Sequence, residues 1–94
     1  KTKEEYIVML KKFKEKHASR YGIRSIGIFG SVARGEMTRD VDVFVDLEEA
    51  DPFVMFDIRE ALQSLFGCKV DLVRLRQGLR SSLLKRIEKE GIPV

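Results

Sequence analysis

Apolar residues recur along the chain with two different periods, and the changes of period divide it into alternating helices and strands. Tyr6, Leu10 and Phe13 lie at helical spacing, which predicts an amphipathic first helix. Thr2 is placed to cap the start of this helix, and the pattern ends near Ser19. The chain is therefore expected to open with a helix that packs one face against the core.

Two further helices are indicated in the second half of the chain. Asp51, followed by a proline, is a typical N-cap for one helix, which ends at Gly67. Ser81 or Ser82 can cap the other helix, which runs through Glu90. The first of these helices is expected to bury residues at helical spacing, namely Met55, Ile58, Leu62 and Leu65.

The strands are predicted from residues that alternate with a period of two and from short apolar runs between turn residues. They are residues 24–29, 41–45 and 69–75, with one helical turn at 32–34 between the first two and a candidate edge strand at 92–94. This order of elements predicts an α+β fold in which a small mixed sheet is flanked by helices.

Composition narrows the class of protein. A single globular domain over residues 1–94 is expected, because 44% of the residues are hydrophobic, 35% are charged and no apolar run could span a membrane. The net charge of +3 is spread along the helices, which argues against direct binding of nucleic acid.

No charged-then-apolar leader opens the sequence, so a cytoplasmic protein is expected. Cys68 lacks a partner for an internal disulfide and is interpreted as a packed thiol.

The first candidate site lies where the first strand ends. Gly30 and Ser31 break the apolar run just before the predicted helical turn. The first backbone N–H groups of such a turn have no helical partner, and a glycine lets an anion approach them closely. Gly30 and Ser31 therefore predict a phosphate-binding turn. Arg34, at the end of this turn, either steadies phosphate charge or forms a structural ion pair.

The second candidate site consists of carboxylates. Asp40 and Asp42 lie two apart on a predicted strand, so both side chains point to one face of the sheet. Such like charges are most easily explained by a divalent cation, because Mg²⁺ prefers carboxylate oxygens and substrate phosphates. Asp71 is a charge within an otherwise apolar strand. If that strand lies beside Asp40 and Asp42, Asp71 completes a cluster that two metal ions could neutralise; otherwise it is an edge charge or an ion pair.

The Gly30-Ser31 turn, the Arg34-Gly35 pair and the Asp40-Val41-Asp42 pattern together resemble the signature of the polymerase-beta-like nucleotidyltransferase superfamily. The similarity is greatest to its minimal nucleotidyltransferase branch, abbreviated MNT, and extends over nearly the whole chain. This resemblance implies the polymerase-beta-like fold, ATP as the nucleoside triphosphate substrate, and Mg²⁺ bound by Asp40, Asp42 and Asp71 as the catalytic carboxylates. Gly30, Ser31 and Arg34 would bind the nucleotide.

The resemblance also implies a partner. Minimal nucleotidyltransferases of this kind are often paired with a HEPN-domain toxin and add AMP to one of its tyrosine hydroxyls, which makes them antitoxins. Nothing else in the chain indicates an acceptor, and a homo-oligomer is compatible with the sequence.

One departure from the family pattern favours a second hypothesis. The loop between Gly35 and Asp40 is shorter than usual, either because the chain is trimmed there or because the sequence omits residues, and Arg39 replaces the usual serine. Arg39 could contact phosphate in that place. Alternatively, catalysis is impaired and the chain is a binding module that neutralises its partner by occlusion. Retention of all three aspartates favours the enzyme, since a scaffold has no need for like charges gathered on one sheet face.

Overall fold

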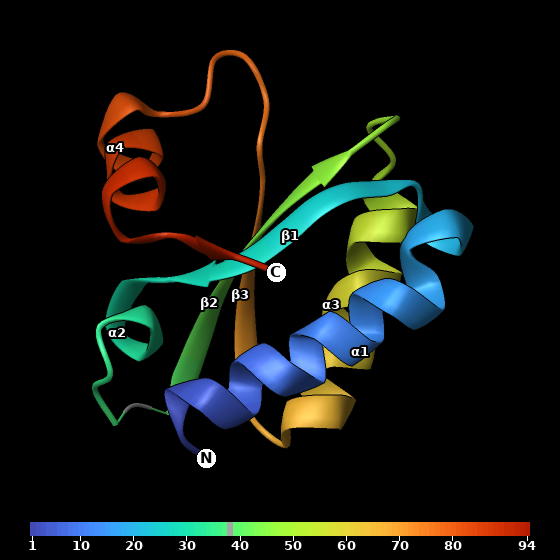
Figure 1. Ribbon diagram of the computed structural model, residues 1–94. Coiled ribbons are helices and arrows are strands. Elements are labelled where there is room, and N and C mark those ends of the chain that lie inside the picture. The colour runs from blue at the N-terminus through green and yellow to red at the C-terminus, as the bar shows by residue number, and fades with distance from the viewer. Residues whose placement is uncertain (38) are drawn as a thin grey trace.

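The computed structural model describes residues 1–37 and 39–94, so Thr38, in the shortened loop, lies outside the described residues. Helices and strands alternate in the predicted order (Figure 1). The helices are α1 (Lys3–Tyr21), α2 (Gly30–Ala33), α3 (Pro52–Phe66) and α4 (Ser81–Glu90). The strands are β1 (Ile23–Phe29), β2 (Asp40–Leu47), β3 (Lys69–Arg74) and β4 (Ile92–Pro93).

The strands form one mixed sheet in the order β3-β2-β1-β4. β1 pairs antiparallel with both β2 and β4, whereas β2 and β3 are parallel because α3 crosses over between them. Figure 1 shows α1 and α3 on one side of the sheet and α2 and α4 on the other. The predicted α+β fold with a small mixed sheet and flanking helices is therefore confirmed.

The face of the sheet that α1 and α3 cover, called the first face below, carries the main hydrophobic core. Val41, Val43 and Val45 of β2 are fully buried there, as strand alternation predicts. They pack with the apolar stripes of α1 and α3, which include Leu10 and Ile58. This core fixes the orientation of β2, and alternation then directs Asp40 and Asp42 to the opposite face.

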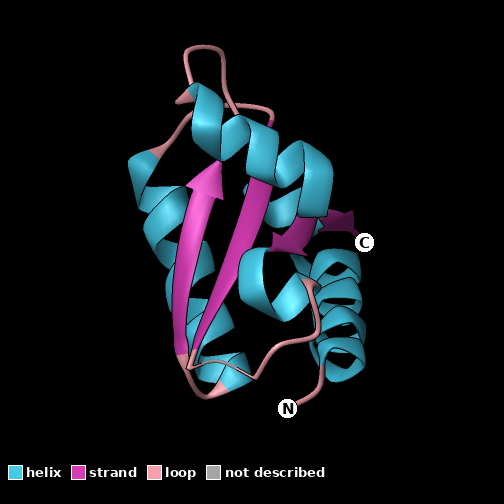
Figure 2. Ribbon diagram, turned by 90° about the vertical axis from the view of Figure 1, so that its left-hand side faces the viewer, coloured by secondary structure: helices cyan, strands magenta, loops and turns pink. Residues whose placement is uncertain are grey.

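The opposite face, on the side of α2 and α4, is called the second face below and is covered only in part. A small cluster of Phe29, Phe44 and Ile87 seats α4 over one end of the sheet. The ring of Phe44 lies against Gly27, where any side chain would overlap it. In Figure 2, α4 crosses one end of the strands, while the first parts of β2 and β3 continue beyond it. The carboxylates lie on this partly covered part of the sheet.

Helix ends and helix faces differ in places from the sequence prediction. The Thr2 capping box and the Asp51 cap are confirmed, and Gly67 ends α3 with φ of 71°. Leu65 was expected in the buried stripe of α3, but it is 43% exposed, and Phe66 is buried in its place. The reason is that Phe66 follows Leu62 by four residues and so continues the stripe on the same side.

The predicted serine cap of α4 is also wrong. Arg80 occupies the N-cap position, and no side chain caps the helix there. α4 therefore depends on its packing rather than on a local signal, and within it only Ile87 is buried. In the part of the chain that the structure describes, no helix is long and apolar enough to cross a membrane. The cytoplasmic location stays a prediction.

Candidate nucleotidyltransferase active site

The register of the sheet brings the predicted carboxylates together. Asp42 of β2 pairs with Asp71 of the parallel strand β3, and both side chains leave the same face of the sheet. Asp40 precedes Asp42 by two residues on the same strand and therefore faces the same way. The predicted juxtaposition of the three residues is confirmed. Their roles as metal ligands stay a prediction.

The electrostatics of Asp42 reflect this crowding. Burial raises the pKa of the Asp42 carboxyl above its usual range, and the nearby Asp71 and Asp40 carboxylates raise this pKa further. The guanidinium groups of Arg86 and Arg34 act in the opposite direction and lower the same pKa. Asp42 is thus the half-buried centre of a cluster in which like charges are partly compensated by two arginines.

The donor chemistry suits a hard cation. The converging groups are carboxylates, and oxygen ligands of this kind are those that Mg²⁺ prefers in phosphoryl-transfer sites. Among the residues that the structure describes, however, no three His, Cys, Asp or Glu side chains already converge tightly enough to hold a metal ion. Mg²⁺ needs only one or two carboxylates beside water and substrate phosphates, so an ion on two of them needs no such group. Binding by all three carboxylates would require them to draw closer, which a cation would favour by neutralising their repulsion.

Gly30 has a different role from the one that its position in the sequence suggested. It adopts φ of 71°, a conformation that favours glycine, at the junction of β1 and α2. A Cβ at this position would overlap the Asp42 carboxylate, which lies directly against the Gly30 backbone. The missing side chain therefore makes room first for Asp42, whereas the sequence indicated only the approach of a phosphate.

Arg34 forms the ion pairs that were one of the two expectations for it. Its guanidinium donates to Glu36 at 2.6 Å and to both carboxylate oxygens of Glu90 at 2.9 Å. It also donates to the hydroxyl of Ser31 at 3.4 Å. Arg34 and Ser31 thus lie together at the α2 turn, and Glu90 of α4 accepts hydrogen bonds from Arg34 there. A nucleotide that used Arg34 would have to compete with these glutamates.

Arg86 also lies at this site, although no pattern in the sequence indicates it. One guanidinium nitrogen lies 3.3 Å from the position that a Cβ on Gly30 would occupy, on the side where Asp42 lies. The guanidinium carbon lies 5.6 Å from the centroid of the Phe29 ring. Only the packing of α4 onto the second face reveals this residue, because nothing in the local sequence distinguishes Arg86 from the other basic residues of the helix.

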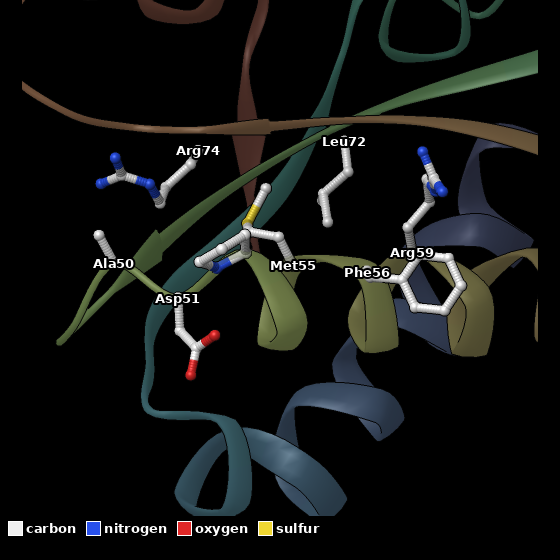
Figure 3. Close-up of a pocket in the computed structure, with 8 residues that line it drawn as sticks. Ala50, Asp51, Met55, Phe56, Arg59, Leu72 and Arg74 are labelled. Atoms are coloured by element: carbon white, nitrogen blue, oxygen red, sulfur yellow. The ribbon is translucent and has the colours of Figure 1, made fainter.

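A hollow of the surface lies away from this site. A cavity of about 420 Å³ opens between the start of α3 and the edge strand β3 (Figure 3). Met55, Phe56 and Leu72 line it, with Arg59 and Arg74 at its side. Leu72 follows Asp71 on β3 and points to the opposite face of the sheet. This cavity is therefore separate from the carboxylate cluster.

The raised pKa of Asp42 predicts how the stability of the metal-free protein depends on pH. A carboxyl whose pKa is higher in the folded state than in the unfolded state binds its proton more tightly when folded, so the protein becomes less stable as pH rises through the folded pKa. Asp42→Asn should therefore be more stable than the wild type at pH 7, by less than about 1 kcal/mol because solvent screens this half-exposed group.

This advantage of Asp42→Asn should disappear in acid, below the unfolded pKa of about 3.9, where both states of the wild type are protonated. Urea unfolding of both proteins across this pH range, in the presence of a chelator, measures the difference. A variant less stable than the wild type at pH 7 would show that the carboxylate is structural.

The fold and this site define a class of protein. A Gly-Ser turn after the first strand, next to an Asp-x-Asp strand paired in register with a third aspartate, is the arrangement expected of a polymerase-beta-like nucleotidyltransferase. The comparison with protein families agrees, because the model of the nucleotidyltransferase domain matches residues 10–94. The chain belongs to this family of enzymes, and within it to the minimal nucleotidyltransferases.

Individual relatives match the chain over its whole length or nearly so. Protein adenylyltransferase MntA of Thermococcus cleftensis is 38% identical over 99% of this chain and 96% of its own length. A solved structure provisionally assigned as a minimal nucleotidyltransferase is 30% identical, with a TM-score of 0.79 over 100% of this chain and 97% of that one.

A more distant structure has the same fold. It is that of a Shewanella oneidensis tri-AMPylated HEPN toxin in complex with an MNT antitoxin, with 22% identity and a TM-score of 0.68 over 94% of this chain and 70% of that one. At this level of identity the match supports the fold alone.

Proposed function

We propose that this chain is a Mg²⁺-dependent protein adenylyltransferase that transfers AMP from ATP to a tyrosine hydroxyl of a HEPN-type toxin, and thereby acts as its antitoxin. The observation that carries the proposal is the pairing of Asp42 with Asp71 beside the Gly30-Ser31 turn. The name of the Thermococcus cleftensis relative supports adenylyl transfer to protein, and the Shewanella oneidensis complex supports a HEPN-type acceptor.

The proposed reaction is an in-line displacement at the α-phosphorus of ATP. The acceptor oxygen bonds to this phosphorus, the bond to the oxygen that bridges the α- and β-phosphates breaks, and pyrophosphate leaves. Asp40 and Asp42 would hold the Mg²⁺. When bound, the metal would neutralise the triphosphate and lower the pKa of the acceptor hydroxyl. Asp71 would either hold a second ion or accept the proton of the hydroxyl.

The turn after β1 would hold the phosphates. The Ser31 hydroxyl and the nearby backbone N–H groups are proposed to donate to the terminal phosphates, and Arg34 to steady their charge. Ser31 already accepts a hydrogen bond from Arg34, so a phosphate bound at Ser31 would lie within reach of the same guanidinium. The pair with Glu36 is exposed to solvent and therefore weak, whereas Glu90 is 21% exposed and contacts Arg34 through both oxygens, so a phosphate would replace Glu36 more easily.

Ser31→Ala should weaken the binding of MgATP by about threefold to tenfold, because it removes one hydrogen bond to a charged phosphate. Isothermal titration calorimetry with a non-hydrolysable ATP analogue measures this directly. Ser25→Ala is a suitable control, because Ser25 lies at the other end of β1 and should leave the affinity unchanged. Equal affinity of the wild type and Ser31→Ala would remove Ser31 from the nucleotide site.

The acceptor is tested by mapping the modified residue. After incubation with MgATP, a HEPN-type protein encoded beside this chain should carry AMP on a tyrosine, as judged by peptide fragmentation. AMP on a serine, threonine or lysine would contradict the tyrosine assignment. Incorporation into RNA instead of protein would contradict the proposed acceptor class.

The occluding binder is the second candidate function. One observation favours it. In the described part of the chain, no group of three His, Cys, Asp or Glu side chains is close enough together to bind a metal ion. The short loop before β2 adds to this, because the resemblance places catalytic groups around it. A binder would neutralise its partner without nucleotide, whereas the enzyme requires MgATP.

A further inference from the structure

The face of α4 that lies over the active site carries two charged residues one helical turn apart. Arg86 and Glu90 are spaced by four residues and therefore lie on the same side of the helix. Both carboxylate oxygens of Glu90 accept hydrogen bonds from Arg34, so this side of α4 faces the α2 turn. Arg86 faces the same turn at Gly30. α4 is thus part of the active site and not only a cover for the sheet.

The position of Arg86 is set by an aromatic ring. Its guanidinium carbon lies 5.6 Å from the centroid of the buried Phe29 ring, at a distance typical of a cation–π contact. Such a contact is an attraction of the cation to the ring and needs no hydrogen-bond acceptor for the N–H donors. Phe29 therefore helps to fix Arg86 beside Gly30 without using its hydrogen-bond donors.

The guanidinium of Arg86 forms no ion pair with the residues that the structure describes. Within the described residues, the salt bridges involve Arg34 and Arg59, and none involves Arg86. Arg86 nevertheless lies close enough to Asp42 to lower the pKa of that carboxyl. In the part of the chain that the structure describes, the permanently charged group beside Gly30 thus has donors that enter no ion pair, whereas the donors of Arg34 are directed to Glu36 and Glu90.

We propose that Arg86 binds the phosphates of the nucleotide that leave as pyrophosphate. This inference rests on the proposed function, which places the terminal phosphates at Gly30 and Ser31. A guanidinium next to that turn can donate to two phosphate oxygens at once, a geometry for which arginine is well suited. It would hold the negative charge that develops on the leaving group, while the carboxylates are engaged with the cation.

The alternative is that Arg86 serves only as a counter-ion to the carboxylates. The two roles predict different binding behaviour. A phosphate-binding arginine contributes to the affinity for ATP and for pyrophosphate, but not for AMP, which lacks the leaving phosphates. A counter-ion contributes to none of these affinities directly.

The experiment is calorimetric titration of the folded protein with ATP analogue, pyrophosphate and AMP, each with Mg²⁺. Arg86→Gln should bind the analogue and pyrophosphate at least about tenfold more weakly, since each factor of ten corresponds to about 1.4 kcal/mol and a charged pair contributes that much or more. Its affinity for AMP should not change. Lys85→Gln is the matched control, because it removes one positive charge from the adjacent exposed position of α4.

Arg86→Lys separates charge from geometry. It keeps the positive charge but loses the two-pronged donor, so its affinity for pyrophosphate should fall between those of the wild type and Arg86→Gln. If Arg86→Gln does not fold, as circular dichroism would show, Arg86→Lys decides the question by its affinities for pyrophosphate and AMP.

Unchanged binding of pyrophosphate in the folded variants would overturn the assignment, as would an equal loss of affinity for AMP. These outcomes are distinct from a failure of the proposed function. A wild-type chain that binds ATP but transfers no AMP would contradict the proposed function, while the role of Arg86 is still decided by the titrations. A wild-type chain that binds neither ATP nor pyrophosphate would contradict both.

Discussion

Asp42→Asn should abolish nucleotide transfer while leaving the fold and the binding of the partner intact. Asp42 is the half-buried member of the cluster, paired in register with Asp71 and packed against Gly30. Asparagine has nearly the same shape but no charge, so it should keep the packing and lose the cation. Because a bound metal ion contributes several kcal/mol of charge stabilisation, the rate of transfer should fall by at least about a hundredfold.

The control for this variant lies on the same strand. Asp46→Asn removes a carboxylate from the same face of β2, four residues away and beyond Phe44. It should transfer nucleotide at the rate of the wild type. Rates are measured with labelled ATP and the purified HEPN-type partner, and binding of the partner is measured separately by gel filtration. Full neutralisation of the toxin by Asp42→Asn would instead favour the occluding binder.

Gly30→Ala should damage both stability and activity, whereas Gly35→Ala should affect stability alone. Both glycines adopt positive φ, of 71° and 83°, so alanine at either position costs about 1–2 kcal/mol of backbone strain. Only at Gly30 would the added Cβ also overlap the Asp42 carboxylate; at Gly35 it would meet nothing within 4 Å. Gly30→Ala should therefore also displace Asp42 and slow transfer by about a hundredfold, the usual effect of a small misplacement of a reacting group.

Comparison of the two alanine variants isolates this effect. Urea unfolding gives the loss of stability, and transfer rates are compared at a temperature at which both variants are folded. If Gly30→Ala and Gly35→Ala lose activity equally, backbone strain alone accounts for the loss. In that case the contact between Gly30 and Asp42 would have no part in catalysis.

Much of the fold follows from patterns that are local in the sequence. The apolar alternation of β2 predicts which face Asp40 and Asp42 occupy, and the charge of Asp71 within an apolar strand predicts its place beside them. The Thr2 and Asp51 caps are equally local, because a cap depends on residues only a few positions away. These predictions are confirmed because the decisive neighbours are close in sequence or fixed by strand register.

The features that the sequence did not reveal depend on how distant elements pack. Arg86 and Glu90 reach the active site only because Ile87 seats α4 on the second face of the sheet. The contact between Gly30 and Asp42 depends on the pairing of Phe29 with Asp42 across β1 and β2. Neither relation has a local sequence signature. The same holds for the start of α4, where the two serines suggested a cap that the structure does not use.

The proposed transfer of AMP from ATP to a partner protein adds a known mass to the partner, so it can be tested by intact-mass analysis. The purified chain is incubated with MgATP and the proposed HEPN-type partner, in parallel with Asp42→Asn, and the masses of both proteins are recorded. The partner should gain the mass of one or more AMP groups with the wild type and none with the variant. A stable complex without any gain in mass would contradict the enzyme and would leave occlusion as the means of neutralisation.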